Sequence, residues 1–214
     1  MSGGAPDFFY REAQRLGYVA RSAFKLLQMQ KQYKLITPGC SVLDLGCAPG
    51  AWLQKVKVPT LCDSRVQTIS ADVMNLPKDQ IRKLSPLQKG FSVILSDMCP
   101  IVSGISTRDA ALSAELGMRA LDLAVGGAAL APTRNTEIQS DSSSCSLEDD
   151  SVLKPGGNLI IKLLESEDNK EFSQICKPLF RKSSWLRPKA TRSSSREIYL
   201  ICQGLRRSRV APYA

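Results

Sequence analysis

Charged residues stand at the ends of several short apolar runs, where their side chains could reach a ligand. They are Asp72 in "VQTISAD", Asp97 in "FSVILSD", Lys162 in "NLIIKLL" and Glu197 at the start of "EIYLICQG". Each of them alone is typical of a strand that reaches the surface. Together they are harder to explain as merely structural, because the carboxyl ends of strands are where a cofactor pocket would lie in an α/β fold.

Histidine is absent from the chain, which removes the commonest general base and the commonest ligand of catalytic metals. Chemistry must therefore depend on Lys, Asp, Glu, Ser or Cys, and no metal is expected. The seven cysteines include no C-x-x-C pair, which favours a reducing intracellular compartment over a disulfide framework or a zinc site. Cys99 is a poor candidate nucleophile, since no histidine can activate it.

A glycine-containing turn follows the first apolar run, in "VLDLGCAPGAW". Gly46 and Gly50 let the backbone approach a ligand closely, Pro49 stiffens the loop, and Asp44 lies where the strand ends. This pattern is typical of the site that receives a nucleotide-type cofactor. Its spacing differs from G-x-G-x-x-G, and from the residues alone both a dehydrogenase and a plain structural turn remain open.

The order of apolar runs and helical stretches predicts a doubly wound α/β fold with a mostly parallel sheet. We expect a single domain over residues 1–214, interrupted by a disordered, Ser/Asp-rich insert at 131–151. Strands are predicted within 41–46, 66–72, 91–97, 158–164 and 197–204. Helices are predicted within 7–34, with a break near Gly17, and within 77–89, 106–125 and 167–180.

The charge of the chain favours a polyanionic partner. The formal net charge is +9 and the sequence pI is about 9.3, and basic residues gather in the first helices and in the tail. Clustered Lys and Arg gain affinity by displacing counterions from phosphates, so nucleic acid is preferred to an acidic membrane. No apolar run approaches the roughly 20 residues of a membrane span.

Six motifs, in order, resemble the FtsJ-type RNA ribose 2′-O-methyltransferases: "ARSAFKLL", "VLDLGCAPGAW", "ILSDMCPIVSG", "LKPGG", "IIKLL" and "PKATRSSSREIYLICQG". The resemblance implies a Rossmann-like methyltransferase fold, S-adenosylmethionine as cofactor and RNA as substrate. The small size of the chain is similar to that of the ribosomal RNA enzymes of this family, so ribosomal RNA is the preferred substrate. We expect a monomer.

The same resemblance implies roles for individual residues. The catalytic tetrad of the family falls on Lys25, Asp97, Lys162 and Glu197, and the cofactor site on Gly46, Gly50, Trp52, Asp72 and Asp97. Lysine is a base only when it is neutral, and burial beside a second ammonium group favours that form. Lys162 is therefore interpreted as the base, Lys25 as the group that favours its neutral form, and the two carboxylates as orienting groups.

The chain departs from the family pattern after Gln54, where a block of about twenty residues that contains a helix and a strand is missing. One interpretation is that 66–72 is the third strand of the family and that the central second strand is absent. The other is that 66–72 fills the vacant place and Asp72 binds the cofactor ribose. We favour the first, and expect reduced stability or weak cofactor binding. Cys99 and Ile101 also replace residues that are more often small and polar.

Two competing functions follow from these features. The missing block favours a catalytically impaired RNA-binding form that no longer holds the cofactor, whereas the intact tetrad opposes it. A nicotinamide-dependent dehydrogenase explains neither the basic charge nor the tetrad.

Overall fold

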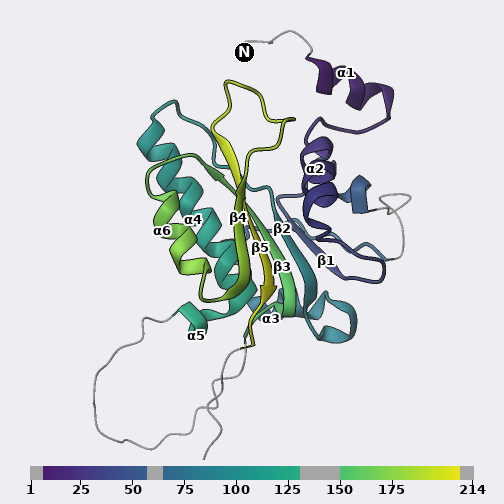
Figure 1. The fold of residues 1–214 in the computed structure, drawn as a ribbon. Coiled ribbons are helices and arrows are strands. Elements are labelled where there is room, and N and C mark those ends of the chain that lie inside the picture. The colour runs from purple at the N-terminus through teal and green to yellow at the C-terminus, as the bar shows by residue number, and fades with distance from the viewer. Residues whose placement is uncertain (1–6, 57–64, 131–149, 208–214) are drawn as a thin grey trace, which may run out of the picture.

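The computed structural model describes residues 7–56, 65–130 and 150–207, which form a five-stranded sheet with helices on both faces (Figure 1). The sheet order is β1-β2-β3-β5-β4. The strands are β1 (Val42–Leu45), β2 (Phe91–Ser96), β3 (Leu153–Leu164), β4 (Phe180–Leu186) and β5 (Glu197–Leu205).

The strands do not all run in one direction. β1, β2 and β3 are parallel, whereas β5 is antiparallel to both β3 and β4. Four strands therefore run one way and β5 runs the other way between two of them. The predicted α/β, Rossmann-like fold is confirmed, with a mixed sheet in which one inserted strand is reversed.

Most of the helices lie where the sequence predicts them, but several are shorter than predicted. They are α1 (Phe8–Arg15), α2 (Ala23–Tyr33), α3 (Lys78–Lys83), α4 (Ser106–Val125), α5 (Gly127–Leu130) and α6 (Asn169–Cys176), with 3-10 turns at Leu53–Val56 and Pro86–Gln88. The predicted break near Gly17 is confirmed, and α4 matches its predicted range. The helix predicted over 167–180 ends at Cys176, and the unpredicted strand β4 follows almost at once.

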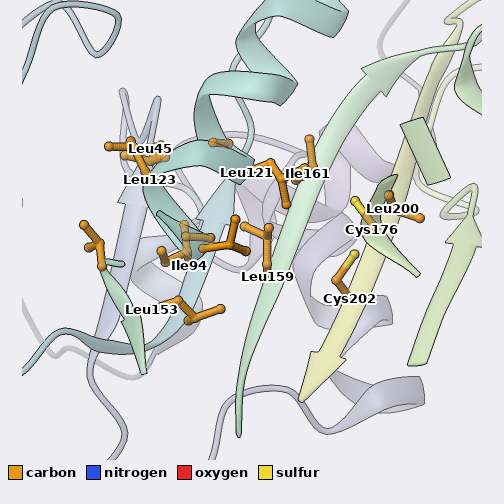
Figure 2. Close-up of a cluster of buried hydrophobic side chains, with 14 of the residues drawn as sticks. Leu45, Ile94, Leu121, Leu123, Leu153, Leu159, Ile161, Cys176, Leu200 and Cys202 are labelled. Atoms are coloured by element: carbon orange, nitrogen blue, oxygen red, sulfur yellow. The ribbon is translucent and has the colours of Figure 1, made fainter. Parts of the chain in front are cut away.

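Two hydrophobic cores cover the two faces of the sheet, because successive side chains of a strand point to opposite faces. Ile94, Leu159 and Ile161 pack with Leu121 and Leu123 of α4 (Figure 2). The alternate residues of β2 and β3, together with Tyr199 and Ile201 of β5, pack with α2 on the other face; those of β2 and β3 are Val93, Leu95 and Ile160. In Figure 1, α4 and α6 accordingly lie on one side of the sheet and α2 on the other.

The prediction of a strand at 66–72 is wrong. These residues form neither helix nor strand, six of the seven are exposed, and Ile69 is 51% exposed. A strand is stabilised by pairing and by packing of one face, and the short alternation in "VQTISAD" lacks both here. Within the described residues β1 is consequently an edge strand that pairs with β2 alone.

Most of the predicted insert, residues 131–149, lies outside the described residues. Its last two residues, Asp150 and Ser151, belong to the described part of the chain. The Asp150 carboxylate lies 2.7 Å from Lys78 Nζ and accepts a hydrogen bond from the Gly127 N–H, and Ser151 is buried. The segment thus returns to the domain through a charged contact at the end of α4.

Candidate active site

The alternation and direction of the strands bring the predicted tetrad together. Asp97 follows β2 on the face that carries Val93 and Leu95, and Lys162 shares that face with Ile160. Because β5 is antiparallel, its first residue lies at the carboxyl end of β3, where Glu197 pairs with Leu164. These three side chains therefore reach the α2 face at one end of the sheet.

The fourth member, Lys25, comes from the first turns of α2 and is only 7% exposed. Its Nζ lies 2.5 Å from Glu197 Oε2. The same ammonium group lies 5.9 Å from the centroid of the Tyr199 ring. A residue from near the start of the chain thus joins one from near its end.

Lys162 is the most enclosed of the four, with 6% of its surface exposed. Its Nζ lies 3.1 Å from Asp97 Oδ1 and 3.7 Å from Glu197 Oε1, and it donates to the Asp97 main-chain carbonyl. The two ammonium groups thus meet at Glu197, and two carboxylates balance them. Burial acts to raise the pKa of Glu197, but the charges of Lys25 and Lys162 outweigh it and the pKa is lowered.

Tyr199 belongs to the site although the sequence reasoning missed it. It pairs with Lys162 across β3 and β5, is fully buried, and donates a hydrogen bond of 2.8 Å to Asp97 Oδ1. Burial, with the charges of Asp97 and Glu197, raises its pKa well above the ordinary value, so the hydroxyl remains a donor. Its place two residues after Glu197 on a strand was the signal for it.

The glycine turn after β1 forms the wall of a small hollow next to the tetrad. Gly46, with φ +74°, approaches Met98 so closely that a Cβ would lie 3.0 Å from Met98 Cγ, so the position favours glycine. The hollow measures about 20 Å³ and is lined by Ser22, Asp44, Gly46, Cys47, Ala48, Pro49, Ala51, Trp52 and Asp97. Gly46, Trp52 and Asp97 of the predicted cofactor site therefore share it.

Two residues of the predicted cofactor site do not line the hollow. Gly50 is buried behind it and shapes the turn, since its N–H donates to the Cys47 carbonyl. Asp72 is exposed, and its carboxylate accepts hydrogen bonds from the Met74 N–H and from the Asn75 side chain. The structure thus places Asp72 in a local turn before α3.

Trp52 is held firmly in the wall. It is 2% exposed, its indole N–H donates to the Ser22 carbonyl at 2.9 Å, and its ring centroid lies 5.9 Å from that of Tyr199. The turn before α2, the turn after β1 and strand β5 are therefore joined through one aromatic pair. Trp52 lines the hollow, and Lys25 Nζ lies 5.9 Å from the centroid of the Tyr199 ring, so the pair connects the hollow with the tetrad.

Asp44 is the unusual charged group of the hollow. Both carboxylate oxygens are buried without a hydrogen-bond partner among the described residues. Burial first, and the nearby charge of Asp97 second, raise its pKa to about 7. The hollow thus holds two carboxylates, and Lys162 and Tyr199 contact only one of them.

The charge, the backbone geometry and the volume of the hollow can each be compared with what S-adenosylmethionine requires. A buried, unpaired carboxylate fits a cationic group, and the close approach at Gly46 fits a ligand that contacts the backbone. The hollow itself is small, because sites that enclose a ligand of drug size measure roughly 300–1,000 Å³. The residues therefore fit the charged end of the cofactor, and the present hollow encloses only a small part of it.

Cys99 lies in the field of all four tetrad charges but is exposed. Desolvation raises the pKa of its thiol, with Glu197 and Asp97 acting in the same direction and the lysines opposing them. A raised pKa disfavours the thiolate, which is in line with the interpretation of Cys99 as a poor candidate nucleophile. The described part of the chain contains no cluster of His, Cys, Asp or Glu able to hold a metal ion, and no helix in it is long and apolar enough to cross a membrane.

A Rossmann-like sheet with a glycine turn after its first strand and acid–base groups at the carboxyl ends defines a methyltransferase-type protein. The FtsJ-like methyltransferase family model matches residues 18–58 and 55–205. The chain belongs to the FtsJ-like methyltransferase family, which confirms the resemblance of the six motifs. The two matched segments overlap at residues 55–58, just after Gln54, where the sequence predicts a departure from the family pattern.

Individual relatives agree with this assignment. The ribosomal RNA large subunit methyltransferase E of Desulfatibacillum aliphaticivorans is 34% identical over 211 residues, which cover 91% of this chain and 88% of that protein. The protein of the same name from Archaeoglobus fulgidus is 33% identical and covers 94% and 97%. A crystal structure of a Plasmodium falciparum protein described as a ribosomal RNA methyltransferase shares the fold, with a TM-score of 0.60, 19% identity and coverage of 88% and 98%.

Proposed function

We propose that this protein transfers a methyl group from S-adenosylmethionine to the 2′-hydroxyl of a ribose in ribosomal RNA. The observation that carries the proposal is the meeting of Lys25, Asp97, Lys162 and Glu197 on one face of the sheet, beside the acidic hollow. The names of the relatives and the basic charge of the chain support RNA as the substrate.

The cofactor, when bound, supplies a methyl group that its sulfonium already activates. The protein must then chiefly position the ribose and accept a proton from the weakly acidic 2′-hydroxyl. Lys162 Nζ is the proposed acceptor. The Glu197 carboxylate lies 2.5 Å from Lys25 Nζ and 3.7 Å from Lys162 Nζ. It therefore interacts more strongly with Lys25 than with Lys162.

The charges around the site suit a cationic methyl donor. The carboxylates of Asp44 and Asp97 line the hollow, and Asp97 also contacts Lys162. A cationic group bound in the hollow is therefore attracted to these carboxylates and lies next to the proposed acceptor. Tyr199 and the main chain of Asp97 keep the acceptor and its partner carboxylate in place.

The first prediction tests Lys162 directly. We expect Lys162→Ala to lower methyl transfer by at least about 100-fold, the usual contribution of a general base. Transfer of a labelled methyl group to transcribed large-subunit ribosomal RNA measures the rate, and alkaline hydrolysis reports ribose methylation because a 2′-O-methyl group blocks cleavage of its linkage. Lys83→Ala, on the exposed surface of α3, is the control.

Lys162→Met keeps the apolar stem and tests whether loss of activity is only loss of folding. Transfer near the wild-type rate in either folded variant would remove Lys162 from the role of base. Calorimetric titration with S-adenosylmethionine separates the enzyme from a form that only binds RNA. We also propose a reducing intracellular compartment and a monomer; the cysteines in the described residues, all free, support the compartment.

A further inference from the structure

Three exposed aliphatic side chains lie on the loop that joins β2 to α4, immediately after the catalytic carboxylate. Ile101 is 94% exposed, Val102 62% and Ile105 57%. Exposed aliphatic residues are common singly, but a group of them on one short loop beside a reactive site is characteristic of a contact surface. We refer to these three residues as the aliphatic loop.

The aliphatic loop is adjacent to the tetrad through its first residues. Asp97 contacts Lys162, Met98 is buried against Gly46, and the thiol of Cys99 interacts electrostatically with all four tetrad residues. Ile101 follows two residues later. A ligand that places a group at Lys162 Nζ therefore lies next to the residues from which the aliphatic loop continues.

The far end of the loop is fixed to α4. The buried carboxylate of Asp109 accepts hydrogen bonds from the Ser103 N–H at 2.8 Å, from the Ser103 hydroxyl at 2.7 Å and from the Gly104 N–H at 3.1 Å. These hydrogen bonds lower the pKa of Asp109, so it stays ionised at neutral pH. The loop is therefore held in shape, and its aliphatic side chains point outward from a fixed backbone.

Basic residues lie beside the aliphatic loop. Arg196 precedes Glu197 and donates to the Ser106 and Glu165 carbonyls, so it joins the start of α4 to the end of β3. Arg108 is exposed on the first turn of α4. The loop between β4 and β5 projects at this same end of the sheet (Figure 1). An aliphatic surface with cationic neighbours suits a ligand that has both flat apolar faces and phosphates.

We propose that the aliphatic loop packs against the unstacked base of the RNA nucleotide whose ribose is presented to Lys162. This inference rests on the proposed function and adds to it a contact with the base. The base is attached to C1′, the neighbour of C2′, so a 2′-hydroxyl at the lysine brings its own base within a few ångströms. Aliphatic side chains commonly pack against bases that are turned out of a stack.

RNA binding by an Ile101→Asn/Ile105→Asn double variant tests the proposal. The probes are a labelled 12-residue oligoadenylate and a chain of equal length built from abasic ribonucleotides, which keeps the phosphates and the 2′-hydroxyls. We expect the double variant to bind the oligoadenylate roughly tenfold or more weakly and the abasic chain equally well, because only the base is lost as a partner. Leu87→Asn, 83% exposed on a different loop, is the matched control.

Salt dependence gives a second measurement. The apolar contact releases no counterions, so the slope of log affinity against log salt should be the same for wild type and double variant. Titration with S-adenosylhomocysteine should also give equal affinities, which shows that the cofactor site is intact. Substitution at such exposed positions should leave the unfolding temperature unchanged.

Equal binding of oligoadenylate by wild type and double variant would overturn the proposal and leave the aliphatic loop free for a protein partner instead. Equal weakening on both probes would overturn it too, since the bases would then not be the partner. Failure of the proposed function is a separate result: wild type would transfer no methyl group, whatever the loop contributes to RNA binding.

Discussion

At the scale of single residues, Asp44 bears a charge that its surroundings disfavour. Its carboxylate is buried without a hydrogen-bond partner, and Asp97 lies close to it. The ordinary pKa of 3.8 is raised to about 7. Between these values the folded protein holds a proton that the unfolded chain has lost, so the free energy of unfolding falls as the pH rises through this window.

Asp44→Asn, which carries no charge at any pH, should therefore stabilise the protein at pH 8. The shift to about 7 gives an upper estimate of about 4 kcal/mol, at 1.36 kcal/mol per pKa unit. The gain should shrink steadily as the pH is lowered towards 4. Urea unfolding of wild type and variant across this range measures it, with Asp79→Asn on α3 as the exposed control. A pH-independent difference would contradict the predicted cause.

The residue scale also shows what sequence reasoning could reach. The sequence places Asp97, Lys162 and Glu197 at or near the ends of predicted strands, and the alternation of side chains along a strand indicates which face of the sheet they share. These two features are enough to suspect a common site. They do not place Lys25, which stands among several other basic residues in its helix. Lys25 entered through family resemblance, and the structure shows why it differs from its neighbours: Glu197 offers it a buried partner.

At the scale of elements, α4 is held against β3 through a glycine. A Cβ on Gly117 would lie 2.7 Å from Leu163 Cδ2, 3.2 Å from Phe172 Cε2 and 3.3 Å from Ile161 Cγ2. Helix propensity favours alanine over glycine by about 1 kcal/mol. Overpacking of a core costs about 1–3 kcal/mol, so the steric term should exceed the gain in propensity.

We predict that Gly117→Ala lowers the free energy of unfolding by about 1 kcal/mol, since the buried side chains of Leu163, Phe172 and Ile161 must shift to admit the added Cβ. Chemical denaturation measures the change. Gly127→Ala is the matched control, because no atom lies within 3.7 Å of the Cβ that it would add. If Gly117→Ala were as stable as its control or more stable, the contact between α4 and β3 would be looser than the distances indicate.

Helices and strands were predicted correctly where the hydrophobic pattern of the segment alone is enough to identify them. The predictions failed where a segment becomes a strand only by pairing with a neighbouring strand. Helix α4 combines length with helical spacing, and its range was predicted correctly. Residues 66–72 have the alternation of a strand but no neighbour to pair with, and they remain irregular. Strand β4 was missed because its polar sequence, "FRKSSWL", becomes a strand through pairing with β5 at the edge of the sheet.

At the scale of the whole molecule, β1 is the edge strand of the sheet that the described residues form, and it lies next to the hollow. We attribute this edge to the departure from the family pattern that the sequence predicts after Gln54, close to where the two segments of the family match overlap. The carboxyl end of β1 carries the glycine turn, so the hollow has neighbouring strands on one side only. Its volume of about 20 Å³ agrees with an incomplete wall.

The expected consequence is weak binding of S-adenosylmethionine. Insertion after Gln54 of the corresponding block from the Archaeoglobus fulgidus relative should lower the dissociation constant by about tenfold or more, because added walls would bury more of the cofactor. Calorimetry on both proteins measures it, and a glycine–serine insert of equal length is the control, since it adds chain without a packed surface. An unaltered dissociation constant would contradict this prediction. It would mean that the residues on the tetrad side of the hollow alone determine the affinity for the cofactor, and that an additional strand beside β1 adds nothing to it.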